Sequence, residues 1–321
     1  MTRTERMLLF VRHHRNPLLT AETWPHTVNA VFNPGATRLK DGTTLLLCRV
    51  EDRRGMSSLW AARSPNGVDN WEIDPEPTFP PGGDEYPEEE WGVEDARIVW
   101  LEELGKYAIT YTAYSQTGPA VSLALTEDFR RFERMRVIMP PEDKDAALLP
   151  RRIGGMWVMV HRPITGLGAD IWIAESPDLE HWGKHRLLMA ARRGSWWDAG
   201  RIGIGPPLIE TSEGWLMLYH GAHQNADGYI YRMGMALLDH DDPGRCLIRS
   251  HEWVLGPHED YERQGDVGSV VFPCGCTAGD DGESLNLYYG GADTCVALAC
   301  ARVPELLAWL KTHSFEACRP D

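Results

Sequence analysis

A unit of short strands and turns that recurs five times is the feature of this chain that most constrains its fold. Each unit opens with a polar or glycine-rich segment, passes through one strand to a glycine turn, and then adds two further strands. The units follow one another at intervals of roughly 50–70 residues, which is typical of repeat architectures. The five turns are Asp41-Gly42, Leu104-Gly105, Gly154-Gly155, Glu213-Gly214 and Asp281-Gly282.

Two strands follow each of these turns. We expect the first of them, an apolar run, to be an inner strand of its unit; these runs are residues 44–50, 107–114, 157–161, 215–220 and 285–289. The second is rich in small and apolar residues and covers 58–64, 120–126, 170–176, 231–239 and 294–301. Frequent turns and short strands predict an all-β protein, and five units of about four strands predict a five-bladed β-propeller. A large sandwich is the competing architecture, but it gives no reason for the fivefold recurrence.

One helix is predicted, close to the C-terminus. Pro304 stands in its first turn with Glu305 beside it, and both are typical of a helix start. We therefore divide the chain into an N-terminal arm (1–24), a five-bladed propeller catalytic domain (25–303) and a C-terminal helical appendage (304–321). The arm and the appendage together predict a homo-oligomer.

Charge and apolar patterning exclude several classes of protein. The chain has 47 acidic and 32 basic residues, a net charge of −15, so nucleic acid and anionic membranes are not expected partners. No apolar run approaches the ~20 residues that span a bilayer, and the apolar patch at 7–11 is too short for a signal peptide.

The odd number of cysteines, 7, predicts reduced thiols and a cytoplasmic protein. Cys274-Gly275-Cys276 lacks the spacing of a zinc site, and we expect no metal.

Tryptophan is unusually frequent, with 13 copies against 7 phenylalanines. Most of these residues fall in predicted strands or turns and are interpreted as packing residues. Trp24, Trp91, Trp196 and Trp197 lie near the unit openings, where an indole face suits stacking on a sugar. An acidic run, residues 84–90, is interpreted as a solvated loop. The alternative is that it shapes the sites beyond the cleaved bond, because it lies near the predicted pocket.

Charged side chains gather at the unit openings. In a propeller these openings converge on a shared pocket, and charged residues are uncommon at strand starts unless they cap, pair or act. The acids are Asp95, Asp145, Asp198 and Asp266, and the bases are Arg97, Lys144 and Arg201.

Several of these openings belong to longer motifs that resemble glycoside hydrolase family 130. In chain order the motifs are Asn33-Pro34-Gly35-Ala36, Cys48-Arg49-Val50-Glu51, Gly92-Val93-Glu94-Asp95-Ala96-Arg97, Lys144-Asp145-Ala146-Ala147, Val160-His161-Arg162-Pro163, Leu218-Tyr219-His220-Gly221 and Tyr288-Tyr289-Gly290-Gly291-Ala292-Asp293. The resemblance spans about residues 25–303. It implies a five-bladed propeller and an inverting phosphorylase (a hexosyltransferase of the EC 2.4.1 type) that converts a β-mannoside and phosphate into α-mannose 1-phosphate.

The resemblance also implies residue roles. Asp95 would be the catalytic acid, with its proton passed through the mannose 3-hydroxyl. Phosphate would be held by Lys144, Arg162, His220 and Arg97, and the sugars by Asn33, Arg49, Tyr231 and Asp293. No cofactor is implied, because inorganic phosphate is a co-substrate and the expected partners are phosphate and an oligosaccharide.

The chemistry agrees with this set of residues. An inverting hydrolase needs two carboxyl groups, one as acid and one as base, whereas phosphate is already an anionic nucleophile and needs cations around it instead. Lys144, Arg162 and His220 therefore favour phosphorolysis. A β-mannosidase-type hydrolase of the same fold and a non-catalytic sugar-binding propeller remain alternatives. A third is a hydrolytic five-bladed glycosidase that acts on another sugar, such as an arabinoside, with Asp198 and Asp266 as the candidates for its base and acid. The substrate is expected to be a β-1,4-manno-oligosaccharide or mannosyl-glucose; a 1,2 linkage stays open.

Overall fold

The structure, a computed structural model, describes residues 9–166, 168–226 and 228–316. Strands make up most of this part, and the predicted all-β class is confirmed. In these described ranges helical structure is limited to four short elements: η1 (Gly83–Glu85), η2 (Pro87–Glu89), α1 (Asp260–Arg263) and α2 (Val303–Thr312). Within the described residues no helix is long and apolar enough to cross a membrane.

The first half of the chain forms one sheet of eight strands. These are β3 (Ala30–Arg38), β4 (Thr44–Glu51), β5 (Ser57–Ser64), β6 (Glu72–Ile73), β7 (Gly92–Leu101), β8 (Lys106–Ser115), β9 (Gly118–Thr126) and β10 (Glu133–Met139). A single parallel pair, Ser57 with Gly92, joins β5 to β7. All other neighbours in this sheet are antiparallel, so it consists of two antiparallel four-stranded halves, β3–β6 and β7–β10.

The described part of the chain forms three further antiparallel sheets. The second contains β11 (Asp143–Leu148), β12 (Trp157–Thr165), β13 (Gly168–Ala169), β14 (Ile171–Ser176) and β15 (Gly183–Met189). The third contains β16 (Arg201–Ile204), β17 (Ile209–Thr211), β18 (Gly214–Asn225), β19 (Gly228–Leu238), β20 (Cys246–Ser250) and β24 (Ser314–Glu316). The fourth contains β1 (Val11–Arg12), β2 (Leu19–Thr20), β21 (Val271–Ala278), β22 (Ser284–Gly291) and β23 (Cys295–Arg302).

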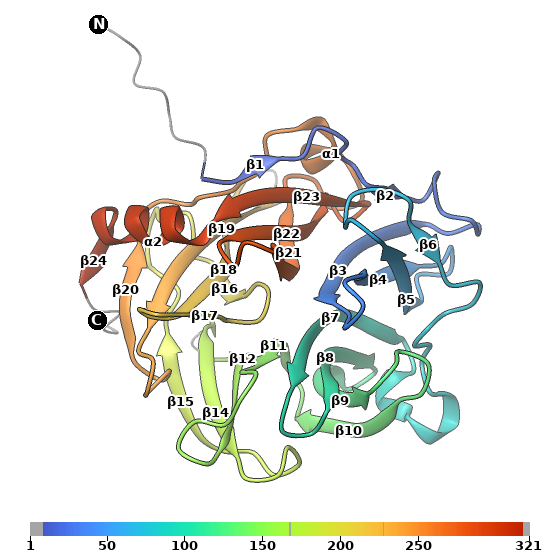
Figure 1. Cartoon of the computed structure of the whole chain (residues 1–321), viewed down its shortest axis with the longest axis horizontal. Helices are drawn as coiled ribbons and strands as arrows, with labels where there is room; N and C mark the ends of the chain where they lie inside the picture. The colour runs from blue at the N-terminus through green and yellow to red at the C-terminus, as the bar shows by residue number, and fades with distance from the viewer. Residues whose placement is uncertain (1–8, 167, 227, 317–321) are drawn as a thin grey trace, which may run out of the picture.

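The sheets are arranged around a common centre, and the first strand of each antiparallel unit lies innermost (Figure 1). These innermost strands are β3, β7, β11, β16 and β21; β3 contacts β7 and β21, and β11 contacts β7 and β16. The prediction that the runs after the glycine turns are inner strands was therefore wrong in its placement. Those runs are β4, β8, β12, β18 and β22, which pair with the innermost strands and lie one position further out.

Both ends of the described chain pack against sheets of the same molecule. β1 and β2 pair with β23, so the described part of the predicted N-terminal arm adds to the last sheet. Arg12 binds the buried Glu262 through two hydrogen bonds of 2.7 and 2.9 Å. Helix α2 lies where a helix was predicted and buries Leu306, Leu307 and Leu310. Residues 1–8 and 317–321 of the predicted arm and appendage lie outside the described residues.

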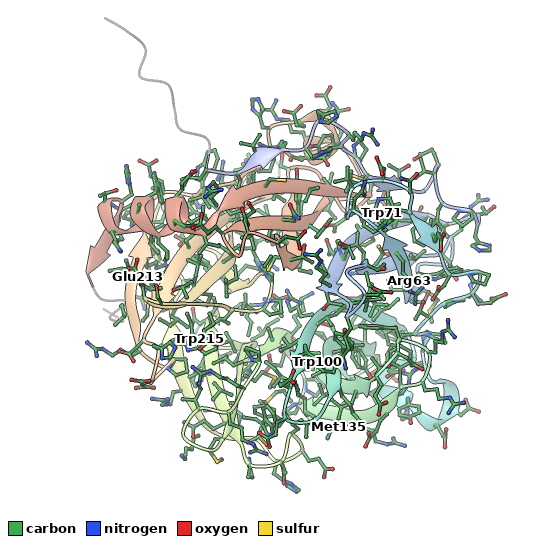
Figure 2. The ribbon with its side chains drawn as sticks, in the orientation of Figure 1. Arg63, Trp71, Trp100, Met135, Glu213 and Trp215 are labelled. Carbon is green, nitrogen blue, oxygen red and sulfur yellow. The ribbon has the colours of Figure 1, made fainter. Side chains whose placement is uncertain are left out.

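The tryptophans mostly fill the spaces between strands. Trp71, Trp100 and Trp215 lie in three different parts of the molecule (Figure 2), and Trp215 is fully buried. Trp24, expected near the site, is buried edge-on against Trp60 at 6.0 Å between ring centroids. Trp91 is 41% exposed and packs edge-on against the Tyr114 ring.

One cysteine contradicts the expectation that all seven thiols are reduced. Cys246 is disulfide-bonded, whereas Cys48, Cys274, Cys276, Cys295 and Cys300 are free. The free ones are buried or half-buried, and burial raises the pKa of the Cys48 and Cys274 thiols well above their ordinary value. These thiols are therefore packing residues rather than nucleophiles.

Candidate active site

Three innermost strands carry the same backbone irregularity at the same place. The antiparallel register shifts at Asn33 in β3, at Asp95 in β7 and at Asp145 in β11. These three residues have positive φ angles of 44°, 51° and 51°. Asn and Asp adopt this left-handed conformation more readily than other side chains, and a bulge re-aims the residue it contains. The bulges therefore bring three buried polar side chains together where the sheets meet.

Asp95 is the centre of the first group of contacts. Its Oδ1 accepts a hydrogen bond from Asn33 Nδ2 at 3.0 Å and lies 3.5 Å from Arg49 Nη1. Arg49 also contacts Glu94 Oε1 through Nη2 at 2.9 Å and donates from Nε to Ser57 Oγ at 2.9 Å. Within the described residues Oδ2 of Asp95 has no hydrogen-bond partner, so this oxygen is available to a substrate.

Asp145 is the centre of the second group. It accepts a hydrogen bond from Arg162 Nε at 2.6 Å, and Arg97 Nη2 and His220 Nε2 lie at 3.3 and 3.5 Å. Burial alone would raise the pKa of Asp145, but Arg162, His220, Arg97 and Lys144 together hold that pKa well below its ordinary value. Asp145 is thus a permanent anion that orients the surrounding cations.

His220 is neutral at ordinary pH. Burial lowers the pKa of its imidazole to about 3, with Arg162, Arg97 and Lys144 acting in the same direction against Asp145. Its Nδ1 is buried and has no hydrogen-bond partner in the described structure. The ring packs against Phe272 at 4.5 Å and lies 5.9 Å from the Tyr231 ring.

Two cations in this group keep donors for a ligand. Lys144 of β11 and Arg162 of β12 lie opposite each other in the antiparallel register of the two strands. Neither Nζ of Lys144 nor the two terminal nitrogens of Arg162 bind another part of the chain that the structure describes. Such donors beside a neutral imidazole form a site for a small anion. Arg97 differs, because it donates to the carbonyl oxygens of Gly205, Asp95 and Ile204 at 2.8, 3.0 and 3.0 Å as well as facing Asp145.

The remaining predicted sugar-binding residues border these two groups. Asp293 has a positive φ of 56°. Burial, followed by the nearby Asp95, raises the pKa of Asp293 to about 6, although Arg49 and Lys144 oppose this. The Tyr231 ring centroid lies 5.9 Å from the His220 ring and 5.9 Å from the Arg201 guanidinium. The structure thus brings together all nine predicted catalytic, phosphate-binding and sugar-binding residues, which with Glu94 and Asp145 we name the central cluster.

The other charged openings do not contribute a free carboxylate to the central cluster. Asp198 is fully buried and its Oδ2 binds Arg249 at 2.6 Å, the Tyr219 hydroxyl at 2.9 Å and Arg192 at 3.1 Å. Asp266 is exposed and accepts a hydrogen bond from Asn29 at 2.8 Å. Asp198 is therefore a structural anion of the third sheet.

Several residues of the site were not identified from the sequence. Glu94 holds Arg49, and its position beside Asp95 was the available signal. Gly203 has no side chain because a Cβ there would lie 2.6 Å from Asp145 Oδ2 and from His220 Cε1. The acidic run is not simply solvated: Glu89 is fully buried and accepts hydrogen bonds from the Tyr111 hydroxyl at 2.6 Å and from Gly82 N at 2.7 Å.

Metal-ligating side chains do not gather in this site. Among residues 9–166, 168–226 and 228–316, no group of three His, Cys, Asp or Glu side chains is placed to hold a metal ion. The charged groups of the central cluster instead pair cations with carboxylates, a composition suited to an anion and a polyhydroxyl ligand side by side.

Comparison with known proteins agrees with this composition. A family model described as beta-1,4-mannooligosaccharide phosphorylase matches residues 4–312. The chain is 34% identical to a beta-1,4-mannooligosaccharide phosphorylase of Ruminococcus albus over 312 residues, which cover 94% of this chain and 91% of the relative. It is 40% identical to a beta-1,2-mannobiose phosphorylase of Listeria innocua over 261 residues, covering 81% and 70%.

The fold is also shared with solved structures. A structure of the beta-1,2-mannobiose phosphorylase from Listeria innocua, in complex with beta-1,2-mannobiose, superposes with a TM-score of 0.85 at 32% identity. The superposition covers 95% of this chain and 99% of the other.

Proposed function

The chain belongs to glycoside hydrolase family 130 and is a glycoside phosphorylase, and we propose that it cleaves β-mannosides with inversion to give α-D-mannose 1-phosphate and a shortened sugar. One observation carries the proposal. Among the residues that the structure describes, Nζ of Lys144 and the terminal nitrogens of Arg162 have no partner beside the buried Asp145, and one carboxylate oxygen of Asp95 has none next to Arg49. An anion site and an acid therefore face the same ligand.

In the proposed reaction the phosphate oxygen attacks C1 of the terminal mannose from the side of Lys144, Arg162 and His220. The glycosidic bond between C1 and the leaving oxygen breaks as the bond between C1 and the phosphate oxygen forms. Asp95 supplies the proton that the leaving oxygen gains, passed through the mannose 3-hydroxyl. No base is required, because phosphate is already anionic. This agrees with the contacts of Asp198, whose carboxylate is bound to Arg249 and Arg192 and is not placed to act as a base.

The other polar residues position these groups. Asp145 orients Arg162 through its Nε and faces Arg97 and His220, so it holds the anion-binding side together. Arg97 connects β7 with β16 through the carbonyl oxygen of Ile204 and also binds the carbonyl oxygen of Asp95. We therefore assign Arg97 a positioning role beside the phosphate. Asn33, Arg49, Tyr231 and Asp293 line the remaining side and bind the sugars.

The architecture proposed for this activity is a five-bladed propeller, in which the eight-stranded sheet provides two blades. The single parallel pair between β5 and β7 supports this count, because each half is otherwise a complete antiparallel unit with its own innermost strand. The bulged strands β3, β7 and β11 then belong to three consecutive blades.

We propose a homo-oligomeric, cytoplasmic enzyme. The disulfide at Cys246 would be unusual in a reducing cytosol. Trapping of free thiols in fresh lysate therefore tests the proposed location.

The preferred substrates under this proposal are β-1,4-manno-oligosaccharides or mannosyl-glucose. The test runs the reaction in reverse, with α-mannose 1-phosphate as donor and mannose, glucose or N-acetylglucosamine as acceptor. The expected product is a β-1,4-linked disaccharide with release of one phosphate per bond, and the D95N variant should form almost none. Formation of β-1,2-linked products alone would correct the linkage, and failure with every acceptor would contradict phosphorolysis.

A further inference from the structure

A buried acid–histidine pair adjoins the cations of the central cluster and has no role in the mechanism above. Asp143 begins β11, and His161 lies in β12, the strand that pairs with β11 (Figure 1). Both residues are 3% exposed, and Oδ2 of Asp143 lies 2.6 Å from Nδ1 of His161. In the sequence they directly precede Lys144 and Arg162, the two cations that keep donors for a ligand.

The other oxygen of Asp143 holds the backbone of Arg162. Oδ1 accepts a hydrogen bond from the backbone N–H of Arg162 at 3.1 Å. The residue opposite Asp143 in the strand register is Pro163, which has no N–H and favours an extended backbone in the residue before it. The main chain of Arg162 is therefore fixed on both sides, by Asp143 at its N–H and by the proline that follows it.

The side chain of Arg162 is held at a second point. Asp145 accepts a hydrogen bond from its Nε at 2.6 Å, and this contact leaves the terminal guanidinium nitrogens for a ligand. Lys144 stands between the two acids in β11 and opposite Arg162 in the register. The contacts of Asp143 and Asp145 together therefore set how the two cations are placed relative to each other.

His161 keeps the carboxylate of Asp143 in this orientation. An ionised carboxylate only accepts hydrogen bonds, so the imidazole donates from Nδ1 to Oδ2. Within the described residues Nε2 of His161 is buried and has no hydrogen-bond partner. A buried nitrogen without a partner costs stability, and an apolar side chain would avoid that cost. Packing alone therefore does not account for a histidine at this position, whereas the hold on Asp143 does.

We propose that Asp143 and His161 are positioning residues for phosphate. His161 fixes the Asp143 carboxylate, and Asp143 fixes the main chain from which Arg162 and Lys144 reach the anion. Cations that are already fixed lose little further freedom when phosphate arrives, and this lowers the cost of binding. The inference rests on the proposed phosphorolysis and deepens it, because it predicts an effect on phosphate that is separate from any effect on the sugar.

The test removes the imidazole donor and then restores it. H161L lacks the hydrogen bond to Asp143, whereas H161N carries an amide N–H that can donate to the same oxygen. KM is measured for phosphate and for a β-mannoside disaccharide, each at a saturating level of the other substrate. H161L should raise the phosphate KM about tenfold, equivalent to about 1.4 kcal/mol, and keep the disaccharide KM within about twofold. H161N should return the phosphate KM to within about twofold of the wild-type value.

The same sheet offers a matched control. His181 Nδ1 lies 2.9 Å from Asp178 Oδ2, and Oδ1 of Asp178 accepts from the backbone N–H of His181 at 2.8 Å. These contacts repeat those of Asp143 and His161, but the control pair is exposed and lies in the turn between β14 and β15, outside the central cluster. H181L should leave both KM values unchanged.

A second variant tests the same hold from the acid. D143N keeps the volume of the side chain, but a neutral amide oxygen is a weaker acceptor than a carboxylate. D143N should therefore raise the phosphate KM about threefold or more and leave the disaccharide KM unchanged.

Phosphate binding is also measured without turnover. Phosphate should raise the unfolding temperature of the wild-type protein, because a ligand that binds only the folded state stabilises it. H161L should need about tenfold more phosphate for the same rise, whereas H161N and H181L should behave as the wild type.

The outcomes separate positioning from a merely structural role. A structural pair would change the amount of folded enzyme, and thus kcat and the unfolding temperature, while both KM values stayed as in the wild type. That result, or an equal increase in both KM values, would overturn the inference. A wild-type protein that cleaves no β-mannoside in a phosphate-dependent way would instead overturn the proposed function, and the thermal measurement would then decide the role of the pair in phosphate binding.

Discussion

Replacing Asp145 by asparagine removes the anion around which three basic side chains are arranged. Asp145 is 1% exposed and contacts Arg162 at 2.6 Å, Arg97 at 3.3 Å and His220 at 3.5 Å. Removing one partner of a buried ion pair costs about 3–5 kcal/mol. Asparagine keeps one carbonyl oxygen for Arg162, so we expect the lower end, about 3 kcal/mol.

This loss converts into a measurable shift of the unfolding temperature. With about 2 cal/mol/K of unfolding entropy per residue, a chain of 321 residues loses about 1.5 °C for each kcal/mol. D145N should therefore unfold about 4–5 °C below the wild-type protein at pH 7. The control is D84N, which changes an exposed carboxylate and should leave the unfolding temperature unaltered. Thermal unfolding followed by circular dichroism measures both.

The pH dependence of the difference identifies its cause. The pKa of Asp145 in the folded protein lies below its value in the unfolded chain, about 3.9. The ionised Asp145 therefore stabilises the fold fully at a pH above its pKa in the unfolded chain. This contribution is lost as the pH falls toward the pKa of Asp145 in the folded protein. The difference in unfolding temperature between D145N and the wild-type protein should stay constant from pH 8 to 5 and become smaller below about pH 4. A D145N protein that unfolds within about 1 °C of the wild type at pH 7 would refute the reasoning.

Three further predictions follow from the same contacts. G203A puts a Cβ 2.6 Å from Asp145 Oδ2, so kcat/KM should fall by about tenfold or more, with a KM increase for phosphate as the signature. The pKa of Asp293 is raised to about 6, so its carboxyl group loses a proton and becomes negatively charged as the pH rises through that value. The D293N variant has no such group and should lack the corresponding step in its pH–rate profile. R12A leaves the buried Glu262 without its cation and should lower the free energy of unfolding by about 3 kcal/mol, measured by urea titration.

Much of the fold followed from the chain's own pattern, because glycine turns and alternating apolar runs are local signals. The strands after the five turns and the helix at Pro304 were placed within a few residues. Which strand of each unit lies innermost was misjudged, because the most apolar run was taken as the most central. In the structure the innermost strands carry Asn33, Asp95 and Asp145 at their bulges. The more apolar second strands also contribute to the site, with Arg49 in β4, Arg162 in β12 and His220 in β18.

The site was predictable to the extent that its residues sit in motifs. Asn33, Asp95 and Asp145 each precede small residues at a unit opening, and this pattern reflects the shared bulge with a positive φ. The burial of Glu89 was not predictable, because its partner Arg134 is 45 residues away and its neighbours are all acidic. The role of Gly203 likewise depends on Asp145 and His220, which only the assembled sheets bring within reach.

The measurement that tests the central claim most directly is the product balance of β-mannoside cleavage with and without inorganic phosphate. Phosphorus NMR counts α-mannose 1-phosphate, and a reducing-sugar separation counts free mannose in the same samples. The account predicts one α-mannose 1-phosphate for each bond broken and no cleavage when phosphate is omitted. Release of free mannose at the same rate in both samples would contradict it.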